Sequence, residues 1–156
     1  MLKIGPAGDY EHKGTPWDEM GRNGIAQIFI SLGDWIRSLQ FQFVENGSLV
    51  LSEKHGLDIY SSAPKFSVVS VRLNYPLEYI TGISGHSGTR DGEQFVTSII
   101  FTTNNADYGP VGRPTQDDIA FDYQMGEHNK FCGFHGYANL YLNSIVLYGA
   151  DEDSKQ

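Results

Sequence analysis

Hydrophobic residues recur along this chain at every second position, or in short β-branched and aromatic runs, rather than at helical spacing. The clearest stretches are 25–31, 36–44, 95–103 and 141–148. Alternation with a period of two and β-branched composition are typical of β-strands. No stretch combines helical spacing with capping residues over three turns. The pattern therefore predicts an all-β chain of about ten to twelve short strands.

Turn signals separate these stretches. Asn46-Gly47 lies between the apolar runs 41–44 and 49–51 and is the strongest short-range hairpin signal in the sequence. Glycine accounts for 18 of the 156 residues, well above the ordinary share of about 7%. A glycine-rich all-β chain is expected to contain many tight turns.

One pattern occurs three times: aliphatic, any, Ser, aliphatic, any, apolar. The copies are Ile36–Phe41, Val96–Phe101 and Leu142–Leu147. Such an internal repeat favours three similar sheets around one core, with the three serines at equivalent places. A second repeated pattern, in which glycine alternates with bulky residues, occurs at 79–85 and 131–136, ahead of two of the three copies. Chance similarity between strands of like composition is the alternative explanation.

Length and charge narrow the function classes. The chain is long enough for one domain, expected at 1–150, followed by a disordered acidic tail at 151–156. Its net charge of −8 disfavours nucleic acid and anionic membrane surfaces as partners. With no apolar signal region at the N-terminus, we expect a cytoplasmic or nucleocytoplasmic location. The single cysteine, Cys132, allows neither an intramolecular disulfide nor a cysteine-based zinc cage.

Catalytic and metal-binding motifs find little support. The histidines are His12, His55, His86, His128 and His135. They show no i, i+2 or i, i+4 pair, so we expect no metal site and place each histidine in a loop or at the surface. Cys132 and His135 are three residues apart, so on a strand they point to opposite faces. We expect neither an enzyme nor a cofactor.

Several segments match a known family in order and spacing over nearly the whole chain. They are Lys3–Pro6 leading to Trp17-Asp18, then Tyr79–Gly85, Val96–Asn104, Asp107–Pro110 and Gly133–Gly136. Together they resemble the jacalin-related plant lectins. The resemblance implies a β-prism of three four-stranded Greek-key sheets with pseudo-threefold symmetry, and a homo-oligomer.

The resemblance also implies a sugar site at one end of the prism. Family members bind mannose, glucose or galactose there through Gly, three residues and Asp before the last strand. The corresponding residues here are Asn139, Leu140, Tyr141, Leu142 and Asn143, so both signature positions have changed. Gly14, four residues before Asp18, matches the opening-loop glycine whose N–H contacts the sugar.

Each site residue also has a simpler explanation. Asn143 keeps a carbonyl acceptor without the charge of aspartate, but it could equally be a turn or strand-start residue that bonds its own backbone. Tyr141 could stack on a sugar or pack in the protein, and Gly14 could be an ordinary turn glycine.

Two functions follow. The first is a carbohydrate-binding lectin of mannose or glucose type with a weakened or altered site at Gly14 and 139–143. The second is a non-enzymatic protein-interaction module in plant defence that has lost sugar binding.

Overall fold

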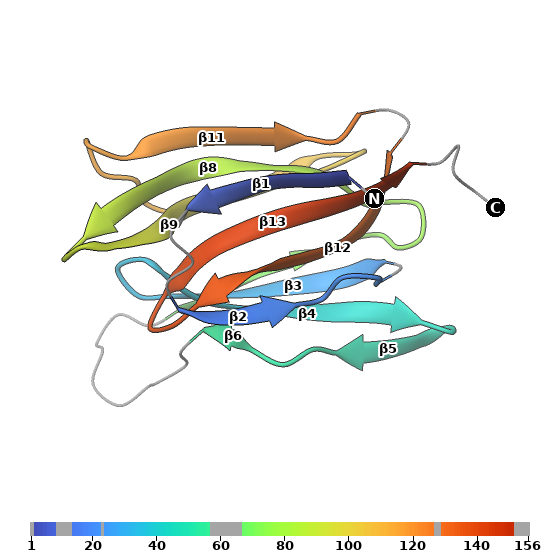
Figure 1. Cartoon of the computed structure of the whole chain (residues 1–156). Helices are drawn as coiled ribbons and strands as arrows, with labels where there is room; N and C mark the ends of the chain where they lie inside the picture. The colour runs from blue at the N-terminus through green and yellow to red at the C-terminus, as the bar shows by residue number, and fades with distance from the viewer. Residues whose placement is uncertain (1, 9–13, 23, 57–66, 127–128, 152–156) are drawn as a thin grey trace.

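The computed structural model describes residues 2–8, 14–22, 24–56, 67–126 and 129–151. Within these ranges the chain forms thirteen strands and no helix. These described ranges therefore contain no helix able to cross a membrane. The fold is all-β, as the hydrophobic pattern predicts (Figure 1).

The strands form three antiparallel sheets. Sheet A has the order β1 (Leu2–Gly8), β13 (Leu142–Asp151), β12 (Asn129–Ala138) and β2 (Thr15–Asp18). Sheet B has the order β5 (Ser48–Leu51), β4 (Ile36–Glu45), β3 (Ile25–Leu32) and β7 (Ser67–Arg72). Sheet C has the order β10 (Asp107–Gly112), β9 (Glu93–Thr103), β8 (Ile80–Arg90) and β11 (Ile119–Gln124).

The strand count is slightly higher than expected because one edge of sheet B is interrupted. The two-residue β6 (His55–Gly56) pairs with the start of β4, while β5 pairs with its end. Residues 52–54 separate the two short strands. Since β5 and β6 share one edge of β4, sheet B keeps the four-stranded plan of the other two.

The predicted threefold repeat is confirmed by the strand registers. Ser38 of β4 lies opposite Gly56, Ser98 of β9 opposite Gly112, and Ser144 of β13 opposite Gly8. Each serine lies on an inner strand, and each glycine lies on an edge strand with positive φ. The three serines therefore occupy equivalent places.

A β-bulge next to each serine strengthens this equivalence. The register shifts so that the residue before the serine has no partner on the neighbouring inner strand. These bulged residues are Arg37, Thr97 and Asn143. Bulges re-aim a side chain, so the three sheets present three different side chains at one equivalent position.

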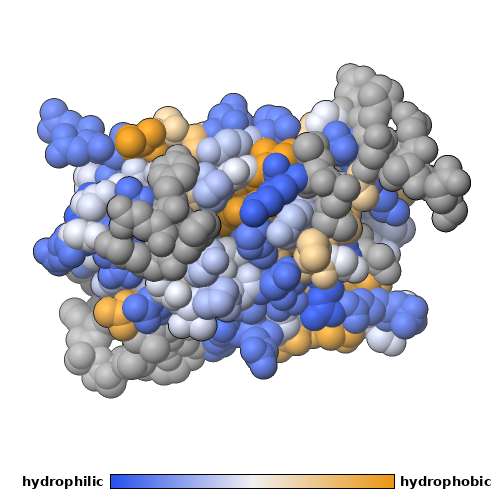
Figure 2. Space-filling view, in the orientation of Figure 1, coloured by the Kyte–Doolittle hydropathy of each residue, from blue (hydrophilic) through white to orange (hydrophobic). Residues whose placement is uncertain are grey.

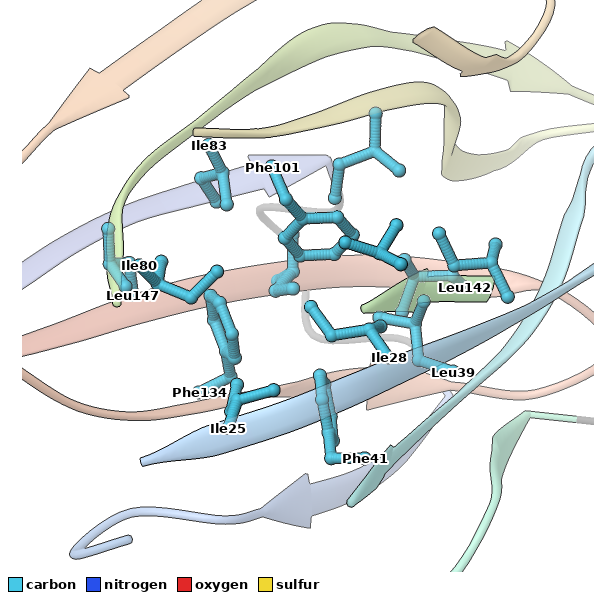
Figure 3. Packing of buried hydrophobic residues seen from close by; sticks show 14 of the residues in the cluster. Ile25, Ile28, Leu39, Phe41, Ile80, Ile83, Phe101, Phe134, Leu142 and Leu147 are labelled. Atoms are coloured by element: carbon cyan, nitrogen blue, oxygen red, sulfur yellow. The ribbon is translucent and has the colours of Figure 1, made fainter. Parts of the chain in front are cut away.

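The core lies where the three sheets meet. Phe41 of sheet B, Phe101 of sheet C and Phe134 of sheet A are fully buried and converge there (Figure 3). The ring of Phe134 lies 5.5 Å from that of Phe41 and 5.9 Å from that of Phe101, between centroids. Each sheet thus covers the apolar faces of the other two.

Other expectations have mixed outcomes. The Asn46-Gly47 hairpin is confirmed, with Glu45 opposite Ser48 and φ of 51° and 79° at the two turn residues. β13 continues to Asp151, and the rest of the predicted tail, 152–156, lies outside the described residues. The placement of every histidine in a loop or at the surface is wrong for His55, which is buried, while His12 and His128 lie outside the described residues.

Candidate functional site

The candidate site lies at the end of the prism where β12 passes into β13, at the left of Figure 1. We call residues 139–143 the sugar loop. Asn139 and Leu140 are exposed, and the backbone N–H of Asn139 donates to the carbonyl of Tyr141 over 3.0 Å. The next residues, Leu142 and Asn143, already belong to β13 and are completely buried.

The two polar atoms of the Asn143 side chain have different surroundings. Its Nδ2 donates to Glu93 Oε1 over 2.8 Å and to the carbonyl of Gln94 over 2.9 Å. Its Oδ1 is buried and has no hydrogen-bond partner in the described part of the chain. The amide therefore ties sheet A to the start of β9, while Oδ1 is left unpaired among the described residues.

Gly14 is brought directly to that unpaired acceptor. It has a φ of +101°, and a Cβ placed there would lie 2.7 Å from Asn143 Oδ1. Only glycine lets the backbone approach so closely in this conformation. The structure thus joins the opening and closing members of the predicted site, Gly14 and Asn143, although they lie far apart in the sequence.

Tyr141 packs within the protein. Its ring lies 5.1 Å from that of Trp35 and 5.4 Å from that of Phe95, and Trp35 and Phe95 are 4.8 Å apart. Each of the three residues stands two positions before a bulged residue, so they are equivalent in the three sheets. This aromatic triad favours packing over sugar stacking for Tyr141.

Two arginines lie over the aromatic triad. The Arg37 guanidinium lies 6.0 Å from the Tyr141 ring, and that of Arg90 lies 5.8 Å from the Trp35 ring. Both distances suit a cation–π contact. Arg90 also donates to Asp118 over 3.2 Å, so it joins the triad to the segment between β10 and β11.

Asp118 lies at the same end of the prism, directly before β11 of sheet C. Its carboxylate accepts hydrogen bonds from Thr97 Oγ1 over 2.6 Å and from the Thr115 backbone over 2.9 Å. Burial alone would raise the pKa of Asp118, but these hydrogen bonds, with those from the Thr115 hydroxyl and Arg90, outweigh it and lower the pKa to about 2. Thr97 occupies in sheet C the bulge position that Asn143 occupies in sheet A. In sheet C the side chain at this position therefore bonds within the protein, to Asp118.

A groove that the sequence did not reveal runs from the sugar loop along the seam between sheets A and B. This seam groove has a volume of about 750 Å³ and lies between β2 and the β5–β6 segment. Thr15, Asp18, Glu53 and Asn139 are exposed along it. Figure 2 shows mainly pale to hydrophilic surface over β2 and β6.

Buried charges and rings form the floor of the seam groove. His55 Nε2 lies 2.9 Å from Glu19 Oε1, and its ring stacks on Trp17 at 4.4 Å. Arg22 pairs with Glu19 over 3.0 Å and also with Glu45. No local motif marks this network, because its members meet only when the edges of two sheets come together. Among the described residues no group of His, Cys, Asp and Glu is arranged to hold a metal ion.

Three antiparallel sheets around a pseudo-threefold axis define this chain as a β-prism protein. The jacalin-like lectin domain model matches residues 4–148, and the chain belongs to that family of carbohydrate-binding proteins.

Individual relatives agree with this assignment. The chain is 43% identical over 141 residues to Protein RESTRICTED TEV MOVEMENT 1 of Arabidopsis thaliana, covering 86% of this chain and 78% of the relative. Frutalin from Artocarpus incisa aligns with a TM-score of 0.81 at 29% identity, covering 96% of this chain and 95% of frutalin. An artocarpin–mannotriose complex aligns with a TM-score of 0.80 at 26% identity, covering 96% and 97%.

Proposed function

We propose that this chain is a carbohydrate-binding lectin of mannose or glucose type whose sugar site is altered and weak. One observation carries the proposal: Gly14 lies beside the buried Oδ1 of Asn143, which has no hydrogen-bond partner among the described residues. An unpaired buried acceptor costs free energy unless a donor reaches it. A sugar hydroxyl supplies such a donor, and artocarpin, a relative of the same fold, forms a complex with mannotriose.

The same geometry accounts for weak binding. In the family motif an aspartate accepts from two sugar hydroxyls, whereas Asn143 offers one neutral oxygen because its nitrogen is committed to Glu93 and Gln94. Hydrogen bonds to neutral groups contribute about 0.5–1.5 kcal/mol, against about 1.5–3 kcal/mol for charged ones. We expect a dissociation constant for a monosaccharide in the millimolar range or weaker.

Titration calorimetry of the wild-type chain with methyl α-mannoside tests the proposal. Saturable binding that Asn143→Ala abolishes supports it, since alanine removes the acceptor. Methyl α-galactoside serves as the control sugar, because the proposed site is of mannose or glucose type. Wild-type binding that survives Asn143→Ala unchanged contradicts the assignment of the site.

A second candidate is a non-enzymatic protein-interaction module in plant defence. It is favoured by the commitment of the Asn143 amide to an internal contact and by the similarity to Protein RESTRICTED TEV MOVEMENT 1. This candidate predicts no binding of any mannose- or glucose-containing glycan on an array. A positive array signal competed by free mannoside decides for the lectin.

A further inference from the structure

We infer that the ligand is an extended oligosaccharide, and that the seam groove holds the sugar units beyond the one at the sugar loop. The inference rests on the proposed function, because it takes a glycan as the ligand class. It adds a second binding surface, formed by the unpaired edges of β2 and β5–β6.

The seam groove begins where the candidate sugar site ends. Thr15 directly follows Gly14 and pairs with Ala138, which directly precedes Asn139. Thr15, Ala138 and Asn139 all line the groove. From there β2 runs along it for three residue steps, roughly 10 Å at about 3.3 Å per residue. A ligand bound at Gly14 and Asn143 can therefore continue into the groove without turning away from the protein.

The rim of the groove has the chemistry that sugar hydroxyls need. Asp18 and Glu53 place exposed carboxylates along it, and Asn139 adds an exposed amide. Carboxylates accept charge-assisted hydrogen bonds from hydroxyl groups, while the amide can donate or accept. A chain of hydroxyl-rich units matches this mixture of donors and acceptors.

The floor of the groove is compatible with a neutral ligand. Glu19 is paired with both His55 and Arg22, and Arg22 is also paired with Glu45. Each of these groups therefore has a polar partner within the protein, and none of them requires a charged ligand. The stacked rings of Trp17 and His55 hold it in place.

The edge of β2 is poorly suited to an added peptide strand. The backbone N–H groups of Glu19 and Gly21 donate inward to β12, at the carbonyls of Phe134 and Cys132. By alternation, the backbone N–H positions of residues 16, 18 and 20 point away from β12. Pro16 has no N–H to donate, and the N–H of Met20 is taken by Asp18 Oδ1 over 2.8 Å. These features favour a glycan over a peptide that extends the sheet.

Calorimetric titrations with methyl α-mannoside and with a linear mannotetraose test the inference. We expect the tetrasaccharide to bind wild type at least tenfold more tightly than the monosaccharide. Asp18→Asn with Glu53→Gln should remove most of that gain and leave monosaccharide binding unchanged. Glu53→Gln alone serves as a second variant, since Asp18 also bonds its own backbone segment.

Asp34→Asn with Asp117→Asn is the matched control. Both residues are exposed at the end of the prism that carries the sugar loop, but they line hollows other than the seam groove. This variant should therefore bind both ligands with wild-type affinity. Equal affinities for the two ligands would overturn the groove inference and leave the proposed function intact. Tetrasaccharide binding that depends on Asp18 and Glu53, without monosaccharide binding, would support the groove and remove the sugar-loop site. Absence of binding by both ligands would overturn both.

Discussion

Asn143 cannot be replaced by the aspartate of the family motif without a second change at a neighbouring residue. An aspartate there would place a carboxylate oxygen where Nδ2 now donates to Glu93 and Gln94. Three oxygens would then meet in a buried place without a proton among them. The side chain at 143 is therefore coupled to that of Glu93, and the two must be changed together.

The first prediction follows from this coupling. Asn143→Asp alone should lower the free energy of unfolding by roughly 1–3 kcal/mol, because it buries unsatisfied acceptors. Adding Glu93→Gln supplies an N–H donor and should recover part of that loss. Urea denaturation of both variants, with Glu93→Gln alone as the control, measures the effect. Wild-type stability of Asn143→Asp would show that the amide bonds are not formed.

The same double variant also bears on sugar binding. With a charged acceptor beside Gly14, its affinity for methyl α-mannoside should exceed that of wild type by roughly 1–2 kcal/mol, the difference between charged and neutral hydrogen bonds. Titration calorimetry measures it. Binding weaker than wild type would indicate that a ligand contacts the asparagine amide itself.

Asp118 gives a prediction about pH. Its native pKa of about 2 lies below the ordinary value of 3.8, so its ionised form stabilises the fold above about pH 4. This contribution is lost as the pH falls towards 2. The stability advantage of wild type over Asp118→Asn should therefore shrink by roughly 1–2 kcal/mol between pH 5 and pH 2. Urea denaturation across this range checks it. Asp117→Asn, at an exposed neighbouring carboxylate, serves as the control.

The edge strands depend on glycines that touch the bulged backbone. Gly112 has a φ of +92°, and a Cβ there would lie 2.3 Å from the carbonyl oxygen of Thr97. Gly8 and Gly56 make the equivalent approaches to Asn143 and Arg37. A side chain at these positions needs both a strained conformation and a shift of an inner strand.

This contact can be separated from strain alone. Gly92 has a φ of +76°, and a Cβ there would have no atom within 4 Å, so Gly92→Ala should cost only about 1 kcal/mol of strain. Gly112→Ala should cost about 2–4 kcal/mol, because overpacking adds to the strain. Thermal or urea unfolding of the two variants compares them. Equal losses would contradict the close approach of β10 to β9.

The elements were predictable where the information is local. Alternation over 25–31 and 36–44 predicts β3 and β4, and Asn46-Gly47 predicts the hairpin of β4 with β5. The pattern repeated around Ser38, Ser98 and Ser144 even predicts the symmetry. By contrast, the burial of His55 depends on Glu19 and Trp17, which reach it from a different sheet. The orientation of Asn143 likewise depends on Glu93, fifty residues away. No pattern of neighbouring residues contains these contacts.

The three sheets share a single core, so no sheet is expected to be stable without the others. Phe134 contacts the rings of Phe41, Phe101 and Phe131, and thereby joins all three sheets. On the face in view in Figure 2, hydrophobic side chains appear only in separate patches. The stability of the prism should therefore respond to the core as a unit.

The last prediction tests that unity. Phe134→Ala should lower the free energy of unfolding by about 3–5 kcal/mol, since it removes a fully buried ring from the centre of the core. Leu49→Ala, at a side chain 62% exposed, should change it by less than about 0.5 kcal/mol. If the sheets form one cooperative unit, tryptophan fluorescence and far-UV circular dichroism should report the same unfolding midpoint in wild type and in both variants. Trp17 lies on β2 of sheet A, and Trp35 lies in the aromatic triad contributed by all three sheets. Fluorescence therefore follows sheet A and the loop end, whereas circular dichroism follows every strand. Separate midpoints in Phe134→Ala would show that one sheet can unfold while the others persist, and that the shared core is not what holds the prism together.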